Sequence, residues 1–383
     1  MYARSRGTDF QGKNMISLFK PFFGEDEIEA LRPIFASGWI GLGPKTELFE
    51  QEFGAYVGTK YCVGVNSGTA ALDLAVRLLG IGRGDEVIVP TITFVSTAHA
   101  VAYNLAQPVF ADVAYDSLCI DPQDVAKRIT RRTRAIMAVH YGGRAADIDR
   151  LRAVAGKIPI IEDAAHGTGA FYKGNHVGSL GAVGCFSFHA VKNLAMGDGG
   201  ALTLSDQEMA ERARRLRWLG IDKNTWDRSN LGESYWWEYY VDEIGLKCHM
   251  NDMQAAIGLV QLKKLKAMND RRREIVATYY DQLKGIEQVE LPLPDDDTYR
   301  SSWHIFHIKC DRRNGLATHL SSKGITTGVH YKPIHLYSCY GNQPRLPASE
   351  RAFDRILSLP LHPGLTDGDV RFVCESIKEF YRK

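Results

Sequence analysis

Short apolar runs and longer amphipathic stretches alternate along the chain from about residue 60. The apolar runs are rich in β-branched side chains and predict strands at residues 61–65, 86–90, 108–113, 135–140, 158–163, 185–188 and 201–204. The amphipathic stretches between them predict helices at residues 69–80, 97–105, 122–129 and 147–156. This alternation predicts an α/β fold with a mostly parallel, doubly wound sheet.

The pattern changes in the second half of the chain. Ser205 and Glu208 have the spacing of a capping box and predict the start of a helix after the last strand. One long helical pattern, straight or bent, follows at residues 252–285. The last part mixes a strand-like stretch with two helical patterns, at residues 301–310, 349–357 and 367–381. It predicts a smaller C-terminal α+β domain.

These patterns divide the chain into three parts. The polar segment 1–14 precedes the first apolar residues and is expected to be an N-terminal extension. Residues 15–265 are expected to form the large domain, and residues 266–383 the small one.

Composition narrows the function classes. The chain has 383 residues, is 45% hydrophobic and 24% charged, and carries a net charge of +2, which gives no electrostatic case for binding nucleic acid. Its seven cysteines form no CxxC pair, so neither a disulfide framework nor a zinc site is expected. No apolar run is long enough to predict a membrane span. We therefore expect a cytoplasmic protein that binds no metal, nucleic acid or membrane.

Chemistry-bearing residues follow several predicted strands, at the sheet edge where α/β proteins bind ligands. Ser67, Gly68 and Thr69 come directly after the first strand and open a helix. The exposed amides of a helix N-terminus favour an anion such as phosphate. The alternative is an ordinary strand-to-helix turn with a hydroxyl cap.

Two further strand ends carry an aromatic and an acidic residue. Phe94 follows the strand at residues 86–90 and lies either in a cleft or in the core. Asp163 ends a strongly apolar strand, where a carboxylate is costly unless a cation pairs with it. It either caps the following turn or pairs with a protonated ring nitrogen of a ligand. His166 is close enough in sequence to reach the same cavity.

Lys192 lies between a predicted strand and the glycine-rich turn at residues 197–200, with Ser187 close by. A single loop lysine is usually solvated. A lysine that forms a Schiff base must instead be partly desolvated, and the neighbouring residues of Lys192 are suitably apolar.

Together, these features match what pyridoxal 5′-phosphate (PLP) requires. The phosphate needs amides and hydroxyls, and the ring needs a flat partner. The ring nitrogen needs an acidic residue, and the aldehyde needs a lysine. The sequence therefore predicts a PLP site.

The chain also resembles the DegT/DnrJ/EryC1/StrS family of PLP-dependent sugar aminotransferases. The resemblance is carried by ordered motifs from residue 38 to the C-terminus: "GWIGLGPKTELFEQEF", "NSGTAALDLA", "GDEVIVPTITFVST", "IEDAAHGTGAFYKGNHVGSLG", "CFSFHAVKNLAMGDGGAL", "GLKCHMNDMQAAIGLVQL", "GVHYKPIHL" and "ILSLPLHPGLT". It implies the type I PLP (aspartate aminotransferase-like) fold.

The resemblance also implies a role for individual residues. Lys192 would be the Schiff-base lysine and Asp163 the partner of the ring nitrogen. The remaining cofactor contacts would come from an aromatic that stacks on the ring, a residue near the ring hydroxyl and a set of phosphate contacts: Phe94, His166, Ser67, Gly68, Thr69 and Ser187. Lysine at position 192, where sugar dehydratases of the family have histidine, favours transamination.

The family is dimeric, and each of its active sites is completed by the neighbouring subunit. Residues 245–252 correspond to the segment that reaches across, but Lys247 and His249 stand where an asparagine usually meets the phosphate. His249 is therefore a candidate contact from a partner subunit. Trp39, Ile40 and Gly41 are candidates for the substrate side of the site.

The expected reaction moves an amino group from L-glutamate to a nucleotide-linked keto-deoxysugar, with a 4-keto sugar favoured over a 3-keto sugar, through pyridoxamine phosphate (PMP). His330 and His335 are candidate substrate residues, or else pack within a strand and turn. The alternatives are a type I PLP lyase or aldolase, a sugar dehydratase, and a non-catalytic regulatory protein.

Overall fold

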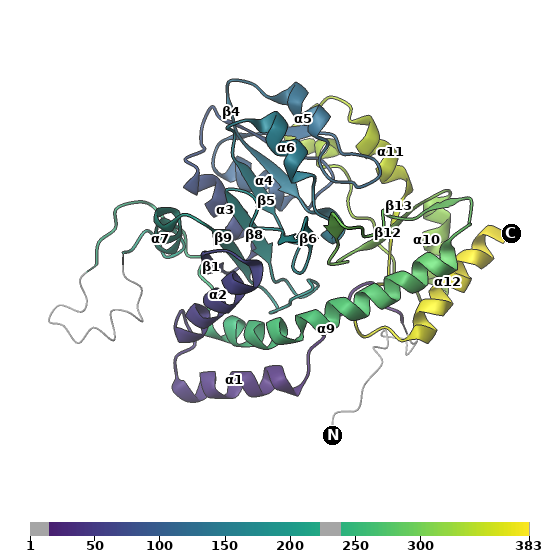
Figure 1. Cartoon of the computed structure of the whole chain (residues 1–383), viewed down its shortest axis with the longest axis horizontal. Coiled ribbons are helices and arrows are strands. Elements are labelled where there is room, and N and C mark those ends of the chain that lie inside the picture. Colours follow the sequence, from purple (N-terminus) through teal and green to yellow (C-terminus); the bar gives the residue numbers. More distant parts are fainter. Residues whose placement is uncertain (1–14, 223–238, 383) are drawn as a thin grey trace.

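The computed structural model describes residues 15–222 and 239–382 and is built around a seven-stranded sheet with the order β1-β9-β8-β5-β4-β2-β3 (Figure 1). Its strands are β1 (Tyr61–Val65), β2 (Glu86–Pro90), β3 (Gln107–Ala111), β4 (Thr133–Val139), β5 (Ile160–Asp163), β8 (Val183–Ser187) and β9 (Gly200–Leu204). Only the pairings of β9, with β1 and with β8, are antiparallel. The predicted mostly parallel α/β sheet is confirmed.

Helices connect the parallel strands, as the alternating pattern predicts. They are α3 (Gly68–Leu78), α4 (Ser96–Tyr103), α5 (Pro122–Arg128) and α6 (Ile148–Ala155). Because α3 and α4 each start soon after a strand, their N-termini lie near the carboxyl edge of the sheet.

Helix α7 (Gln207–Leu216) begins one residue later than the predicted capping box implies. Asp206 is the N-cap residue, and its side chain accepts a hydrogen bond from the backbone N–H of Met209 at 2.8 Å. The prediction that Ser205 caps this helix is therefore wrong. The carboxylate of Asp206, one position later, provides a charged acceptor for this N–H group.

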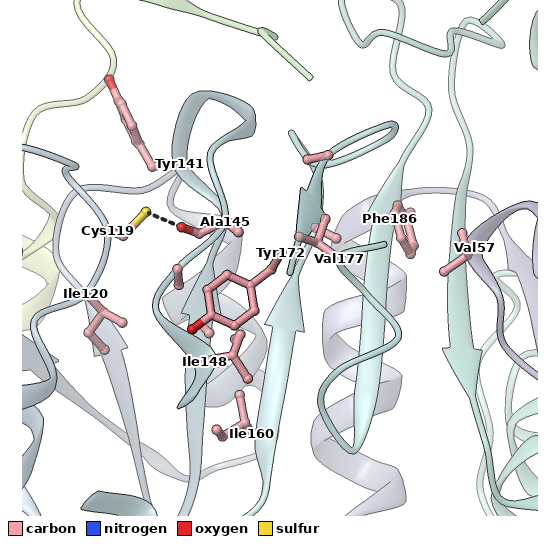
Figure 2. Packing of buried hydrophobic residues seen from close by; sticks show 14 of the residues in the cluster. Val57, Cys119, Ile120, Tyr141, Ala145, Ile148, Ile160, Tyr172, Val177 and Phe186 are labelled. Carbon is pink, nitrogen blue, oxygen red and sulfur yellow. Dashed lines mark hydrogen bonds between the residues drawn. The ribbon is translucent and has the colours of Figure 1, made fainter. Parts of the chain in front are cut away.

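Apolar side chains cover both faces of the large sheet. One cluster contains Phe49 and Phe53 of α2 (Pro44–Val57), and Figure 2 shows another part of it, with Tyr172, Ile148 and Ile160 close together. The other cluster joins the strands to α3 and α7. Both sheet faces are thus buried, which explains the continuous apolar runs of the central strands.

Helix α9 (Asp252–Leu283) is a single helix of 32 residues. It contacts α1 (Glu25–Ser37) and α2 at one end and α12 (Asp367–Arg382) at the other (Figure 1). The boundary expected between residues 265 and 266 falls inside this continuous helix. The expected extension at residues 1–14 lies outside the described residues.

A second, antiparallel sheet packs against the C-terminal half of α9. It contains β10 (Val289–Glu290), β12 (Phe306–Cys310) and β13 (Ile356–Leu359), and a third apolar cluster joins it to α9 and α12. The remaining elements of the described residues are β6 (Phe171–Tyr172), β7 (Asn175–His176), β11 (Tyr299–Arg300), α10 (Arg313–Ser322), α11 (Pro347–Arg355) and 3-10 turns at Tyr141–Gly143, Ile334–Leu336 and Ser338–Tyr340.

Only the second half of the predicted strand at residues 301–310 forms a strand, which is β12. The first half is a loop, because the backbone N–H groups of Ser302, His304 and Ile305 donate to the carbonyls of Gly142 and Gly143. This loop leaves the small sheet and reaches the carboxyl edge of the large one. No helix among the described residues is long and apolar enough to cross a membrane.

Candidate active site

Asp163 lies at the carboxyl end of β5 and is 5% exposed. Thr97 donates its hydroxyl to Oδ2 at 2.8 Å, and the backbone N–H of Ala165 donates to Oδ1 at 3.2 Å. Burial raises the pKa of this carboxyl, and these hydrogen bonds and the charge of Lys192 only partly offset that effect. A carboxylate held in this way stabilises a cation brought against it.

Lys192 lies in the loop between β8 and β9, where its amine interacts electrostatically with Asp163. Burial lowers the pKa of this amine to about 8, although the charge of Asp163 opposes the shift. Its backbone N–H donates to the carbonyl of His189 at 2.8 Å, which fixes the turn. The neutral amine, the nucleophilic form, is therefore accessible near neutral pH.

The predicted anion turn at the start of α3 is closely packed against β8. A Cβ atom placed on Gly68 would lie 2.8 Å from the Cβ atom of Ser187. The hydroxyl of Ser67 accepts a hydrogen bond from the N–H of Ala70 at 3.1 Å and caps the helix. Ser67, Gly68 and Ser187 thus meet at one helix N-terminus, where backbone amides favour a phosphate.

Thr69 completes this region through a residue that the sequence prediction missed. Its hydroxyl lies 2.7 Å from that of Ser96, the first residue of α4. Two helix N-termini and two hydroxyls therefore adjoin each other. The position of Ser96 at a predicted strand-to-helix junction was the signal that could have identified it.

His166 is buried, and its ring is fixed by two contacts. The backbone N–H of Gly142 donates to Nδ1 at 3.3 Å, and Nε2 lies 3.2 Å from the hydroxyl of Tyr331. Burial, together with the charge of Lys192, keeps the pKa of His166 well below its ordinary value. The ring of His304 lies beside it, with the two centroids 4.4 Å apart. Sequence reasoning missed both Tyr331 and His304.

Phe94 is 57% exposed, so it is not a core residue. Its ring centroid lies 6.1 Å from that of Tyr331. A large apolar side chain that remains exposed beside Tyr331 is free to cover a flat ligand ring. The core alternative for Phe94 is therefore wrong.

The two histidines of the "GVHYKPIHL" stretch differ in their surroundings. His330 is half-buried and shares a hydrogen bond of 2.8 Å with Ser358, and burial and the charge of Lys192 lower its pKa to about 4. His335 is buried, with its ring nitrogens at 2.7 Å from the hydroxyl of Thr91 and 3.4 Å from Glu350. The geometry does not support the expectation that His335 binds substrate, because both nitrogens are occupied.

The segments at residues 38–42 and 245–252 meet at a cleft of about 380 Å³. It is lined by Gly38, Trp39, Ile40, Gly41, Leu42, Trp218, Lys247 and His249. The amine of Lys247 lies 3.2 Å from the ring centroid of Trp218. Nδ1 of His249 is buried and has no hydrogen-bond partner within residues 15–222 and 239–382, and burial lowers the pKa of this ring to about 4. The lining includes neither Lys192 nor Asp163.

The residues around Lys192 fit PLP. A desolvated amine, a buried carboxylate, an exposed aromatic ring and a closely packed helix N-terminus are arranged along one sheet edge. Each matches one part of the cofactor, namely the aldehyde, the ring nitrogen, the ring face and the phosphate. Asp163 forms no salt bridge among residues 15–222 and 239–382, so its carboxylate is open to pairing with a cationic ring nitrogen.

Comparison with known proteins agrees with this chemistry. The model of the DegT/DnrJ/EryC1/StrS aminotransferase family matches residues 21–378. The spore coat polysaccharide biosynthesis protein SpsC of Bacillus subtilis (strain 168) is 40% identical over 376 residues, which cover 94% of this chain and 96% of SpsC.

Solved structures show the same fold. The aminotransferase TlmJ from Streptoalloteichus hindustanus has a TM-score of 0.91 and 38% identity, covering 96% of this chain and 99% of TlmJ. Spr1654 from Streptococcus pneumoniae in its PLP form has a TM-score of 0.90 and 32% identity, covering 96% of this chain and 99% of that protein. A PMP form of Spr1654 is also similar. This chain belongs to the DegT/DnrJ/EryC1/StrS aminotransferase family of PLP-dependent sugar aminotransferases.

Proposed function

We propose that this enzyme transfers the amino group of L-glutamate to the keto carbon of a nucleotide-linked keto-deoxysugar, with a 4-keto sugar favoured, in two half-reactions. The observation that carries the proposal is the desolvated amine of Lys192 within electrostatic reach of the buried carboxylate of Asp163. The name of SpsC supports a product destined for a polysaccharide. We place the reaction in the cytoplasm.

Bound PLP supplies the electron sink for this chemistry. Lys192 would hold it covalently between turnovers, and as a free amine would move a proton from the α-carbon of the amino donor. Asp163 would keep the ring nitrogen protonated. Thr97 and Ala165 fix the carboxylate for this task through their hydrogen bonds.

We further propose a homodimer with shared active sites. The cleft formed by residues 38–42 with Lys247 and His249 offers an amine and an imidazole ring beside an aromatic wall, yet it lacks Lys192. These side chains would complete the phosphate and sugar side of the partner subunit's site. Lys247 is the better phosphate ligand of the two, because burial lowers the pKa of His249 to about 4 and keeps that ring neutral.

The test follows each half-reaction by absorbance. Adding L-glutamate to the PLP-loaded protein should convert it to the PMP form and release 2-oxoglutarate. Adding keto sugars with different nucleotides to the PMP form should restore the original spectrum only for the true acceptor. A lyase would release no 2-oxoglutarate, and a purely regulatory protein would bind ligands without turnover. Either result would contradict the proposal.

A further inference from the structure

Tyr331 lies between two residues that the sequence assigns to the cofactor. Its ring centroid is 6.1 Å from that of His166, at an interplanar angle of 22°, and 6.1 Å from that of Phe94, at 57°. The side chain belongs to the segment that leads from the small sheet to the carboxyl edge of the large one. None of the roles expected from the sequence includes Tyr331.

The hydrogen bonds of His166 determine whether the hydroxyl of Tyr331 donates or accepts in its contact with the His166 ring. Because the N–H of Gly142 donates to Nδ1 of His166, that nitrogen carries no proton. Burial keeps the ring neutral, so the single proton is on Nε2. Nε2 therefore donates to the hydroxyl oxygen of Tyr331, 3.2 Å away. Both ring nitrogens of His166 are thus occupied, and the geometry does not support the expectation that His166 itself contacts the ring hydroxyl of PLP.

The proton of the Tyr331 hydroxyl is left without a protein acceptor. The hydroxyl forms no other hydrogen bond within the part of the chain that the structure describes. Burial raises the pKa of Tyr331, so the phenol stays protonated and remains a donor. A chain of hydrogen bonds from Gly142 through His166 thus ends in one O–H group, which each preceding bond polarises.

The charged groups that act on Tyr331 and on its neighbouring rings are Asp163 and Lys192. Lys192 acts electrostatically on His166 and His330, and burial keeps both rings neutral. Asp163 acts on Tyr331 electrostatically, but the carboxylate oxygens of Asp163 already accept from Thr97 and Ala165. A ligand oxygen that carries negative charge would accept a hydrogen bond from the Tyr331 hydroxyl and would also be attracted by the nearby amine of Lys192.

We propose that Tyr331 is a ligand-binding residue of this site, whose hydroxyl donates a hydrogen bond to an anionic ligand oxygen. Two groups offer that chemistry: the ring oxygen of bound PLP and a carboxylate oxygen of the amino donor. The second source rests on the proposed function, and the first does not.

The test uses Tyr331→Phe, which removes only the hydroxyl. Tyr279→Phe is the matched control, because the hydroxyl of Tyr279 is buried and donates to the carbonyl of Pro360 at 2.8 Å in the third cluster. Circular dichroism of both variants establishes that they fold. If Tyr331→Phe fails to fold, Tyr331→His, which retains a ring donor, takes its place and should show smaller shifts in the same direction.

The first measurement titrates the visible absorbance of the PLP-loaded proteins with pH. A donor to the ring oxygen withdraws negative charge from it, so losing that donor leaves the oxygen better able to hold the neighbouring proton. We expect the midpoint in Tyr331→Phe to rise by about one pH unit, the size expected for one hydrogen bond to a charged atom. The control should keep the wild-type midpoint.

The second measurement determines the dissociation constant of glutarate, a dicarboxylate without an amino group, by calorimetry on the PLP-loaded proteins. If Tyr331 holds the carboxylate of the donor, the constant should rise about tenfold in Tyr331→Phe while the absorbance midpoint stays unchanged. If wild-type protein does not bind glutarate, the absorbance titration decides alone.

The inference is overturned if both quantities in Tyr331→Phe agree with the wild type and the control. Neither measurement involves sugar transfer. The proposed function fails if the wild-type protein aminates no keto sugar, and this result does not depend on how Tyr331→Phe behaves. The two failures can therefore be told apart.

Discussion

Burial shifts the pKa values of Lys192 and Asp163, the two ionisable side chains of the site, in opposite directions. It lowers the pKa of Lys192 to about 8 and raises that of Asp163. In both cases the neutral form becomes more accessible, because removing a charge from water is costly. The neutral amine of Lys192 is thus suited to a carbonyl carbon, and the carboxyl of Asp163 to a cationic ligand.

The first prediction concerns the pH dependence of PLP uptake. Only a neutral amine attacks an aldehyde, and if Lys192 holds PLP, the reactive fraction of its amine should rise with pH through a midpoint near 8. We expect the rate of covalent uptake by cofactor-free protein to climb between about pH 6.5 and 9 and then level off. Stopped-flow absorbance measures this rate, and Lys192→Ala, which should bind PLP only non-covalently, is the control. A midpoint near 10.5, the ordinary lysine value, would contradict the buried site.

The second prediction separates function from stability at Asp163. Asparagine keeps the shape and can still accept from Thr97, but it cannot hold a proton on the ring nitrogen. We expect Asp163→Asn to lose about 10²- to 10⁴-fold in kcat. The raised pKa means that the buried anion opposes folding above its ordinary pKa, so the cofactor-free variant should melt no lower than wild type at pH 7. Unchanged kcat would show that Asp163 is not the ring partner.

At the scale of elements, the strand-to-helix junctions place the site. Helix α3 begins directly after β1, α4 begins soon after β2, and Asp163 ends β5. Parallel strands bring these junctions to one edge, so residues distant in sequence meet without long loops. The close approach of α3 to β8 then requires glycine at position 68.

The third prediction tests that close approach. In Gly68→Ala the added methyl group would lie 2.8 Å from the Cβ atom of Ser187, so α3 or β8 must shift. We expect the dissociation constant of PLP to rise about 5- to 150-fold, corresponding to the roughly 1–3 kcal/mol of overpacking. Pyridoxal, which lacks the phosphate, should be affected less. Gly82→Ala, whose nearest contact would be at 3.8 Å, should bind both ligands like wild type.

At the scale of the whole molecule, α9 links the large sheet to the small one. Arg272 and Tyr279 of this helix donate to the carbonyls of Leu361 and Pro360, and Asn269 donates to Thr168 in the large part of the chain. The small sheet is thereby held so that residues 301–305 and 330–335 reach the site. The division of the chain into a large domain at residues 15–265 and a small domain at residues 266–383 therefore stays a proposal.

The fourth prediction tests shared active sites. If one subunit supplies Lys192 and its partner supplies Lys247, Lys192→Ala and Lys247→Ala should each lose activity alone. When equal amounts of the two variants are refolded together, about half of the dimers are mixed, and each mixed dimer contains one intact site of two. The mixture should therefore recover about a quarter of wild-type activity. Mixing Lys192→Ala with Asp163→Asn should restore none, because both residues belong to the same subunit's part of the site. Recovery in that control, or none in the test pair, would contradict the shared site.

Much of the fold could be predicted because burial on both sheet faces leaves a clear signal. All seven strands of the large sheet match an apolar run, and α9 matches its long pattern. Helices α1, α2 and α10 were not predicted. In α10 only Leu316 and Leu320 are buried, so its apolar stripe is too narrow to be seen in the sequence. Residues 301–305 look like a strand, but hydrogen bonds to Gly142 and Gly143 hold them as a loop.

The sequence by itself determined the order of elements, the class of sheet and the residue types suited to PLP, because periodicity and strand-end chemistry are local properties. Only the tertiary structure decided which residues share a site. It brings Tyr331 against His166, Ser96 against Thr69 and Trp39 near Lys247, and it encloses His335 between Thr91 and Glu350. It also decided the protonation of Lys192, since burial depends on segments far away along the chain.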